Sequence, residues 1–103
     1  MLEKILEKKL REKVKMLGGL ALKFYSPWFT GLPDRVVLMP GGKMWWVEMK
    51  KPGSKTEPHQ DARIEMLRKM EFDVRVIDSN ETLTAFIRLL MIEKTKKMID
   101  ESK

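Results

Sequence analysis

The first segment of the chain carries apolar residues at helical spacing. Between positions 2 and 17 they recur every three or four residues, with one adjacent pair, at Leu2, Ile5, Leu6, Leu10, Val14 and Leu17. This spacing places them on one face of an α-helix, and Gly18 follows where a left-handed helix end favours glycine. We therefore predict a helix over residues 2–17 that packs one face against the rest of the fold.

Short runs typical of β-strands come next, at residues 35–39 and 44–50, with a further candidate at 20–25. Pro40-Gly41-Gly42 separates the first two runs, so we predict a β-hairpin with a three-residue loop. In that register Met39 faces Lys43. The same register places Asp34 opposite Glu48.

Two more helices and a strand complete the pattern. Thr56 can cap a helix with Pro58 in its first turn, running to about Met70. Residues 73–77 then predict a strand. Asp78 and Glu81 have the spacing of a capping box before a third helix. The apolar face of that helix is Leu83, Phe86, Ile87, Leu90 and Met91, and we expect the charged residues 93–103 either to fray or to pack on a partner.

The order of helix, two or three strands, helix, strand and helix predicts an α+β fold with helices against a mixed sheet. A chain of 103 residues suffices for one domain, 1–103. The apolar share of 43% is too high for disorder, and no apolar run is long enough to span a bilayer. The charged N-terminus does not match a secretory signal. Zero cysteines exclude disulfides and thiolate metal sites, and fit a reducing cytosol.

The charge balance and the hairpin point toward chemistry on a polyanion. The chain has 21 Lys and Arg against 15 Asp and Glu, a net charge of +6 that favours a partner such as nucleic acid. Two opposed carboxylates, Asp34 and Glu48, repel, and a hard cation such as Mg²⁺ would compensate. Lys50 follows Glu48 by two residues, so it points to the same strand face. By itself this pattern is weak, since a surface hairpin with a solvated lysine is common.

The surrounding residues make the pattern specific. The segments that carry it are GLPDR at 31–35, VEMK at 47–50, Gln60 and VIDS at 76–79, with EKKL at 7–10, GG at 18–19 and KFYSP at 23–27 upstream. They resemble the VRR-NUC domain, the virus-type replication-repair nucleases of the PD-(D/E)XK superfamily. The similarity spans roughly residues 3–80 and is greatest to the stand-alone, phage-type enzymes. One departure is Glu71, where the family commonly has a glycine suited to a left-handed helix end.

The resemblance implies a restriction-endonuclease-like core and a metal site. In the family pattern, Asp34 and Glu48 hold Mg²⁺ or Mn²⁺ together with the backbone carbonyl of Met49. Lys50 would orient or help activate the attacking water and stabilise charge on the phosphate. Gln60 would line the site, the alternative being a glutamine that faces solvent.

Other assignments stay open at this stage. Glu7 could reach the metal directly or through water, or form a salt bridge with Arg11, and Glu3 is the fallback ligand. Arg35 belongs to the family's PDR signature, and structural pairing and DNA contact are equally compatible with its place on the opposite strand face. His59 has no partners at metal-ligand spacing, so we expect an exposed residue at a helix start.

Three lysines flank the predicted hairpin and its loops, where they could contact phosphate or form a solvated basic rim. These are Lys23, Lys51 and Lys55. Trp45 and Trp46 point to opposite strand faces, so we expect one in the core and the other against a helix or a partner.

The expected activity is hydrolysis of a DNA phosphodiester by a metal-activated water. Stand-alone relatives resemble junction-resolving enzymes, so the expected substrate is a four-way junction, with a flap or duplex as the alternative. A non-catalytic DNA-binding module is disfavoured because every site residue is intact, and a purely structural domain would leave the opposed carboxylates unexplained. The resemblance further implies a phage-encoded protein in the cytoplasm of a bacterial host.

Symmetric junction cleavage implies a homodimer, since one chain offers one active site and two cuts are needed. The Trp45-Trp46 pair and the apolar face of residues 83–91 are the candidate interface. The alternative is that both fill the core of a monomer.

Overall fold

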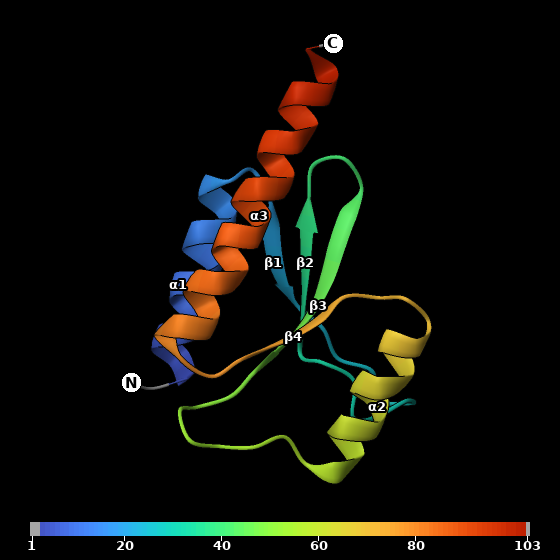
Figure 1. The fold of residues 1–103 in the computed structure, drawn as a ribbon. Helices are drawn as coiled ribbons and strands as arrows, with labels where there is room; N and C mark the ends of the chain where they lie inside the picture. Colours follow the sequence, from blue (N-terminus) through green and yellow to red (C-terminus); the bar gives the residue numbers. More distant parts are fainter. Residues whose placement is uncertain (1–2, 103) are drawn as a thin grey trace.

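The computed structural model describes residues 3–102 and confirms the α+β class (Figure 1). Leu2, expected on the first helix, and Met1 and Lys103, at the ends of the predicted domain, lie outside the described residues. The elements in chain order are α1 (Glu3–Met16), β1 (Leu20–Lys23), β2 (Arg35–Met39), β3 (Lys43–Met49), α2 (Pro58–Lys69), β4 (Val74–Ile77) and α3 (Asn80–Glu101).

The four strands form one mixed sheet in the order β1-β2-β3-β4. The β1/β2 and β2/β3 pairs are antiparallel, and β3 and β4 are parallel. Met39 pairs with Lys43 and Arg35 with Val47, which confirms the hairpin register predicted from the Pro-Gly-Gly loop. The strand expected at 20–25 ends earlier, at Lys23.

Helices cover both faces of the sheet: α1 and α3 lie together on one face, and α2 lies on the other (Figure 1). Alternation along β3 divides its two tryptophans between the layers. Trp45 is buried with α1 and α3, with its ring 6.0 Å from that of Phe86. Trp46 packs with α2 and meets Phe24 edge to face at 5.0 Å. The prediction that one tryptophan enters the core and the other meets a helix is therefore confirmed.

The starts of two helices differ from the prediction by one residue. Glu57, not Thr56, is the N-cap of α2, because Pro58 occupies the first helical position and fixes its φ. Ser79, not Asp78, caps α3: its hydroxyl accepts from the Thr82 backbone N–H at 3.1 Å, and the Thr82 hydroxyl accepts from the Ser79 N–H at 3.1 Å. The capping box is thus shifted by one residue.

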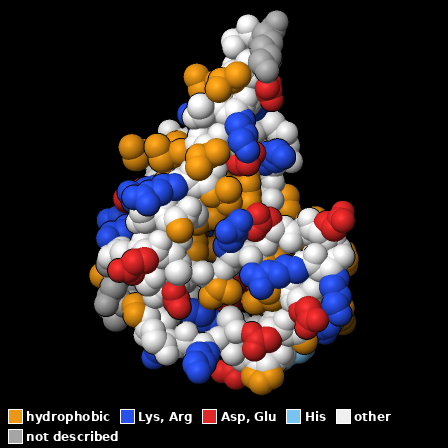
Figure 2. Space-filling view, in the orientation of Figure 1, with side chains coloured by type: hydrophobic (Ala, Val, Ile, Leu, Met, Phe, Trp, Pro, Cys, Tyr) orange, Lys and Arg blue, Asp and Glu red, His pale blue; other side chains and the backbone are white. Residues whose placement is uncertain are grey.

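The last helix continues through most of the segment that was expected to fray or to find a partner. Residues 93–101 are helical, and ion pairs such as Lys97–Glu101, at 3.6 Å, lie along this half. This part of α3 extends past the sheet, and hydrophobic side chains gather over it (Figure 2). The exposed ones are Met91, Ile92, Met98 and Ile99. No helix within residues 3–102 is long and apolar enough to cross a membrane.

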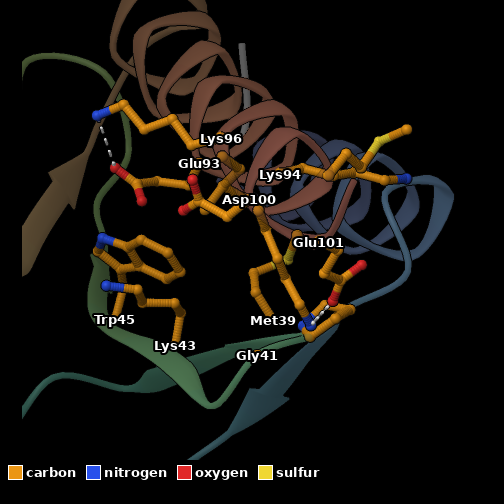
Figure 3. A pocket seen from close by; sticks show the side chains of 13 residues that line it. Met39, Gly41, Lys43, Trp45, Glu93, Lys94, Lys96, Asp100 and Glu101 are labelled. Carbon is orange, nitrogen blue, oxygen red and sulfur yellow. Dashed lines mark ion pairs between the residues drawn. The ribbon is translucent and has the colours of Figure 1, made fainter. Parts of the chain in front are cut away.

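A cavity of about 620 Å³ lies between the C-terminal half of α3 and the tip of the β2–β3 hairpin (Figure 3). Met39, Trp45 and Leu90 supply apolar lining, and charged side chains such as Lys43 and Glu93 complete it. The cavity lies at the end of the hairpin opposite to Asp34 and Glu48, because the tip residues join the far ends of both strands.

Candidate active site

Two carboxylates meet where β2 begins and β3 ends. Asp34 directly precedes β2, and its backbone N–H donates to Glu48 Oε1 at 3.1 Å. In return, Asp34 Oδ1 accepts from the backbone N–H of Met49 at 3.1 Å. The hairpin register therefore brings Asp34 and Glu48 side by side, through reciprocal side-chain to backbone hydrogen bonds.

Glu48 is held from a second direction by α2 and by the residue after β3. Glu48 is a buried residue, with an exposed fraction of 4%. Gln60, in the first turn of α2, donates from Nε2 to Glu48 Oε2 at 3.0 Å, and Lys50 Nζ lies 3.7 Å from the same oxygen. The capping interaction of α2 fixes Gln60 itself, since its Oε1 accepts from the Glu57 backbone N–H at 3.1 Å. Asp34, Glu48, Lys50 and Gln60 thus form one connected network.

Both carboxyl groups have raised pKa values. The pKa of Glu48 is raised from 4.5 to about 7, chiefly by burial and next by the neighbouring Asp34, against the opposing effect of Lys50. Burial also raises the pKa of Asp34, although its hydrogen bond from Met49 lowers it, and the nearby Glu7 adds to the increase. Raised pKa values at adjacent carboxyls mark a place where a bound cation would relieve the excess negative charge.

Helix α1 adds two more carboxylates. Glu3 and Glu7, one turn apart, each place a carboxylate oxygen so that these and one of Asp34 lie within 4.8 Å of one another. Among the described residues Glu48 is not part of this group of three. Three half-buried carboxylates fit a hard divalent cation such as Mg²⁺ or Mn²⁺, which prefers oxygen ligands. The structure therefore brings both Glu7 and the fallback Glu3 to Asp34.

Arg35 and Glu7 pair with each other. Arg35 is 3% exposed, its Nη2 lies 3.7 Å from Glu7 Oε1, and its Nη1 donates to the Ala21 carbonyl at 3.4 Å. Glu7 thus pairs with Arg35 rather than with Arg11, because α1 packs this residue inward toward the start of β2. Of the two alternatives left open by the sequence, the burial of Arg35 favours structural pairing over DNA contact.

Basic side chains border the network. Lys23, Lys51 and Lys55 are all exposed, the last two in the loop that follows Lys50. Lys23 also lines a groove of about 590 Å³ whose walls include Glu7 and Arg35. The remaining lining residues, Lys4, Lys8 and Arg11, were missed from the sequence, although their spacing of four and three residues gives a basic stripe along α1.

His59 is exposed at the start of α2, as expected. One of its ring nitrogens lies 2.9 Å from the Thr30 hydroxyl, which ties the loop between β1 and β2 to the helix. This contact gives His59 a structural role in holding the loop against α2.

Comparisons with known proteins identify the family of the chain. The model of the VRR-NUC domain family matches residues 1–81. A protein of Acyrthosiphon pisum secondary endosymbiont phage 1 named "Putative nuclease p44" is 42% identical over 79 residues, covering 77% of this chain and 85% of that protein. A solved structure described as a VRR_NUC domain superposes with a TM-score of 0.77 at 33% identity, covering 84% of this chain and 94% of the other. The chain belongs to the VRR-NUC family of nuclease domains.

Proposed function

We propose that this chain is a single-domain, metal-dependent endonuclease that hydrolyses phosphodiester bonds in DNA. The observation that carries the proposal is the network of Asp34, Glu48, Lys50 and Gln60, with α1 placing further carboxylates beside it. The carboxylates of this buried cluster provide oxygen ligands for a metal ion, and Lys50 provides a positive charge for the phosphate. Hydrolysis of a phosphodiester uses both. The similarity to a phage protein named as a nuclease supports the same reaction class.

Asp34 and Glu48 would hold a Mg²⁺ or Mn²⁺ ion, together with the backbone carbonyl of Met49. From α1, Glu7 and Glu3 would reach the same ion directly or through water. When bound, such an ion supplies Lewis acidity, which lowers the pKa of water and neutralises charge on the phosphate.

The remaining network residues would act on water and phosphate. Lys50, 20% exposed and anchored 3.7 Å from Glu48, would donate to the attacking water and to the phosphate oxygens as negative charge develops. Gln60 would keep Glu48 oriented through its amide hydrogen bond. Lys23, Lys51 and Lys55, with the α1 stripe, would contact the flanking phosphates.

The substrate we propose is branched DNA, a four-way junction first, cut by a homodimer in the cytoplasm of a bacterial host. Two-fold pairing would supply the second active site. The interface expected from the sequence needs correction, because Trp45, Leu83, Phe86 and Leu90 are buried within the monomer. The exposed α3 face of Met91, Ile92, Met98 and Ile99 is the apolar surface that a second copy would cover.

A labelled panel of four-way junctions, flaps, single strands and duplexes tests the proposal, each incubated with Mg²⁺ or Mn²⁺ and with EDTA as the control. We expect metal-dependent cleavage with preference for the junction, and a dimer mass by sedimentation equilibrium at micromolar concentration. Preferred cutting of flaps or duplex by a monomer would replace the junction assignment. Binding of DNA without cleavage under both metals would overturn the endonuclease and leave a DNA-binding module.

A further inference from the structure

The loop between β1 and β2 presents two aromatic side chains to solvent. Trp28 is 95% exposed and Tyr25 is 83% exposed. Each is a large ring with most of its surface in water, and Trp and Tyr are enriched at the surfaces by which proteins bind their partners. Neither contributes to the two hydrophobic cores of the fold.

The rest of the loop is fixed, so the exposure of these rings follows from a defined backbone path. The Arg63 guanidinium lies 3.8 Å from the centre of the Phe29 ring, and Arg63 Nε donates to the Thr30 carbonyl at 2.9 Å. The Phe29 backbone N–H donates to Ser26 Oγ at 3.2 Å, within the same turn. Helix α2 therefore anchors the inner residues of the loop and leaves Trp28 and Tyr25 pointing outward.

Both ends of this loop meet at the active site. The Phe24 backbone N–H donates to the Asp34 carbonyl at 2.8 Å, so the nine residues 25–33 form a closed loop beside the carboxylate network. Four residues of chain span at most about 14 Å, which limits the distance from the Phe24 Cα to the Trp28 Cα. On a DNA strand this corresponds to about four base steps from the site.

The charges around the loop suit a nucleic acid. Residues 24–33 contain no acidic side chain, and Lys23 at the start of the loop belongs to the basic groove. The aromatic loop follows directly in the chain from this lysine of the groove, and a combination of aromatic rings and basic side chains binds bases by stacking and phosphates by charge. Bases within a duplex are already stacked and paired with one another. Bases with a free face for stacking on a protein ring therefore occur where the strands separate.

We propose that Trp28 and Tyr25 stack on unpaired bases next to the phosphate bound at the Asp34 site, and thereby select DNA with separated strands. This inference rests on the proposed nuclease function, because it takes DNA to be the ligand of that site. Stacking of one base on one aromatic ring is worth about 1–3 kcal/mol, or roughly 5- to 150-fold in affinity. The two rings therefore favour a fork or junction over a duplex of the same sequence.

Binding measured without cleavage tests the proposal. Fluorescence anisotropy with EDTA present gives the affinity for a forked DNA and for a fully paired duplex of matched length. Trp28→Ala is expected to lower fork affinity at least fivefold while duplex affinity changes less than twofold, and Trp28→Phe is expected to keep most of the fork preference. Tyr25→Ala should act in the same direction. Met16→Ala, at the end of α1 and as exposed as Tyr25 at 83%, is the matched control and should change neither affinity.

Three outcomes separate this inference from its alternatives. An equal loss for fork and duplex in Trp28→Ala would overturn base stacking in favour of a general DNA contact. Loss of a wild-type dimer mass in Trp28→Ala, without DNA, would overturn it in favour of an interface between copies. If Mg²⁺ and Mn²⁺ support no cleavage but the fork-specific loss is observed, the loop proposal stands and the nuclease proposal falls. Unchanged melting temperatures of the variants show that folding is intact.

Discussion

The two ends of the β2–β3 hairpin differ in what they bury. At the end where β3 finishes, Glu48 is 4% exposed and is satisfied by hydrogen bonds from Asp34 and Gln60. At the tip, a cavity of about 620 Å³ opens under α3, with Met39 and Trp45 in its lining. A groove of similar volume, about 590 Å³, lies beside Glu7 and Arg35, so cavity size does not distinguish the two ends. Buried carboxyls with specific partners and raised pKa values do distinguish them.

The largest change in cleavage rate is expected from removing a carboxylate at the end where β3 finishes. We expect Asp34→Asn and Glu48→Gln each to lower cleavage roughly a thousandfold or more, because each removes charge where the metal and phosphate would be bound. Both variants should remain folded by circular dichroism. Glu93→Gln and Asp100→Asn, equivalent changes beside the tip cavity, should leave the rate within about twofold. Full activity in Asp34→Asn or Glu48→Gln would show that the carboxylate end of the hairpin is not the active site. Strong loss in a tip variant would place the activity at the cavity instead.

The next effect in size concerns Lys50. We expect Lys50→Ala to lower kcat roughly a hundredfold while DNA affinity and metal-dependent stabilisation stay near the wild-type values, because the ammonium acts on charge that develops in the transition state. Single-turnover kinetics with saturating protein give the rate, and anisotropy gives the affinity. Lys43→Ala at the tip is the matched lysine control. A parallel fall of affinity and rate would instead identify Lys50 as a ground-state phosphate contact.

A third effect is the pH dependence of metal binding. The pKa of Glu48 is raised from 4.5 to about 7 in the folded protein. Between pH 4.5 and 7, the folded protein therefore keeps the proton on Glu48, whereas the unfolded chain has lost it. The contribution of Glu48 to the free energy of unfolding of the metal-free protein accordingly falls as pH rises through this range. Metal needs the ionised carboxylate, so its affinity should rise up to tenfold per pH unit toward pH 7 and then level off.

Thermal melts with and without Mn²⁺ from pH 5.5 to 8 measure this dependence. The melting shift caused by metal should grow with pH in the wild type and grow less in Glu48→Gln. A residual slope at lower pH is expected from Asp34, whose pKa is also raised. Equal slopes in the two proteins would show that Glu48 does not bind the metal.

The sequence could predict the hairpin end of the site because its register is a local property. Pro40, Gly41 and Gly42 set the loop, and the pairing of Arg35 with Val47 follows from it. The neighbouring contact of Asp34 with Glu48 then needs no knowledge of the rest of the fold. The family motif assigned Lys50 and Gln60 to the same place, and both lie in contact with Glu48.

The contribution of α1 could not be predicted in the same way. Whether Glu7 reaches Asp34 depends on how the helix is rotated and placed against the sheet, which helical spacing alone does not fix. The pairing of Glu7 with Arg35, and the arrival of Glu3 in the same cluster, are consequences of that packing. Most of the expected dimer surface is buried for a related reason: an apolar face such as that of Leu83 and Leu90 can cover the chain's own sheet as readily as a partner, which leaves Met91 as its exposed part.

The smallest effect is expected at Glu71, which lies at neither end of the hairpin and should change stability alone. Glu71 has φ 69°, the left-handed conformation that favours glycine, and the Phe72 N–H donates to the Leu67 carbonyl at 3.0 Å to close the end of α2. Glu71→Gly should therefore stabilise the fold by about 0.5–1 kcal/mol, since glycine adopts this φ without a steric penalty. Urea unfolding measures the gain, with Glu65→Gly inside α2 as a control that should lose about 1 kcal/mol. The cleavage rate of folded Glu71→Gly should equal that of the wild type. A changed rate would show that the C-terminal end of α2 also contributes to activity.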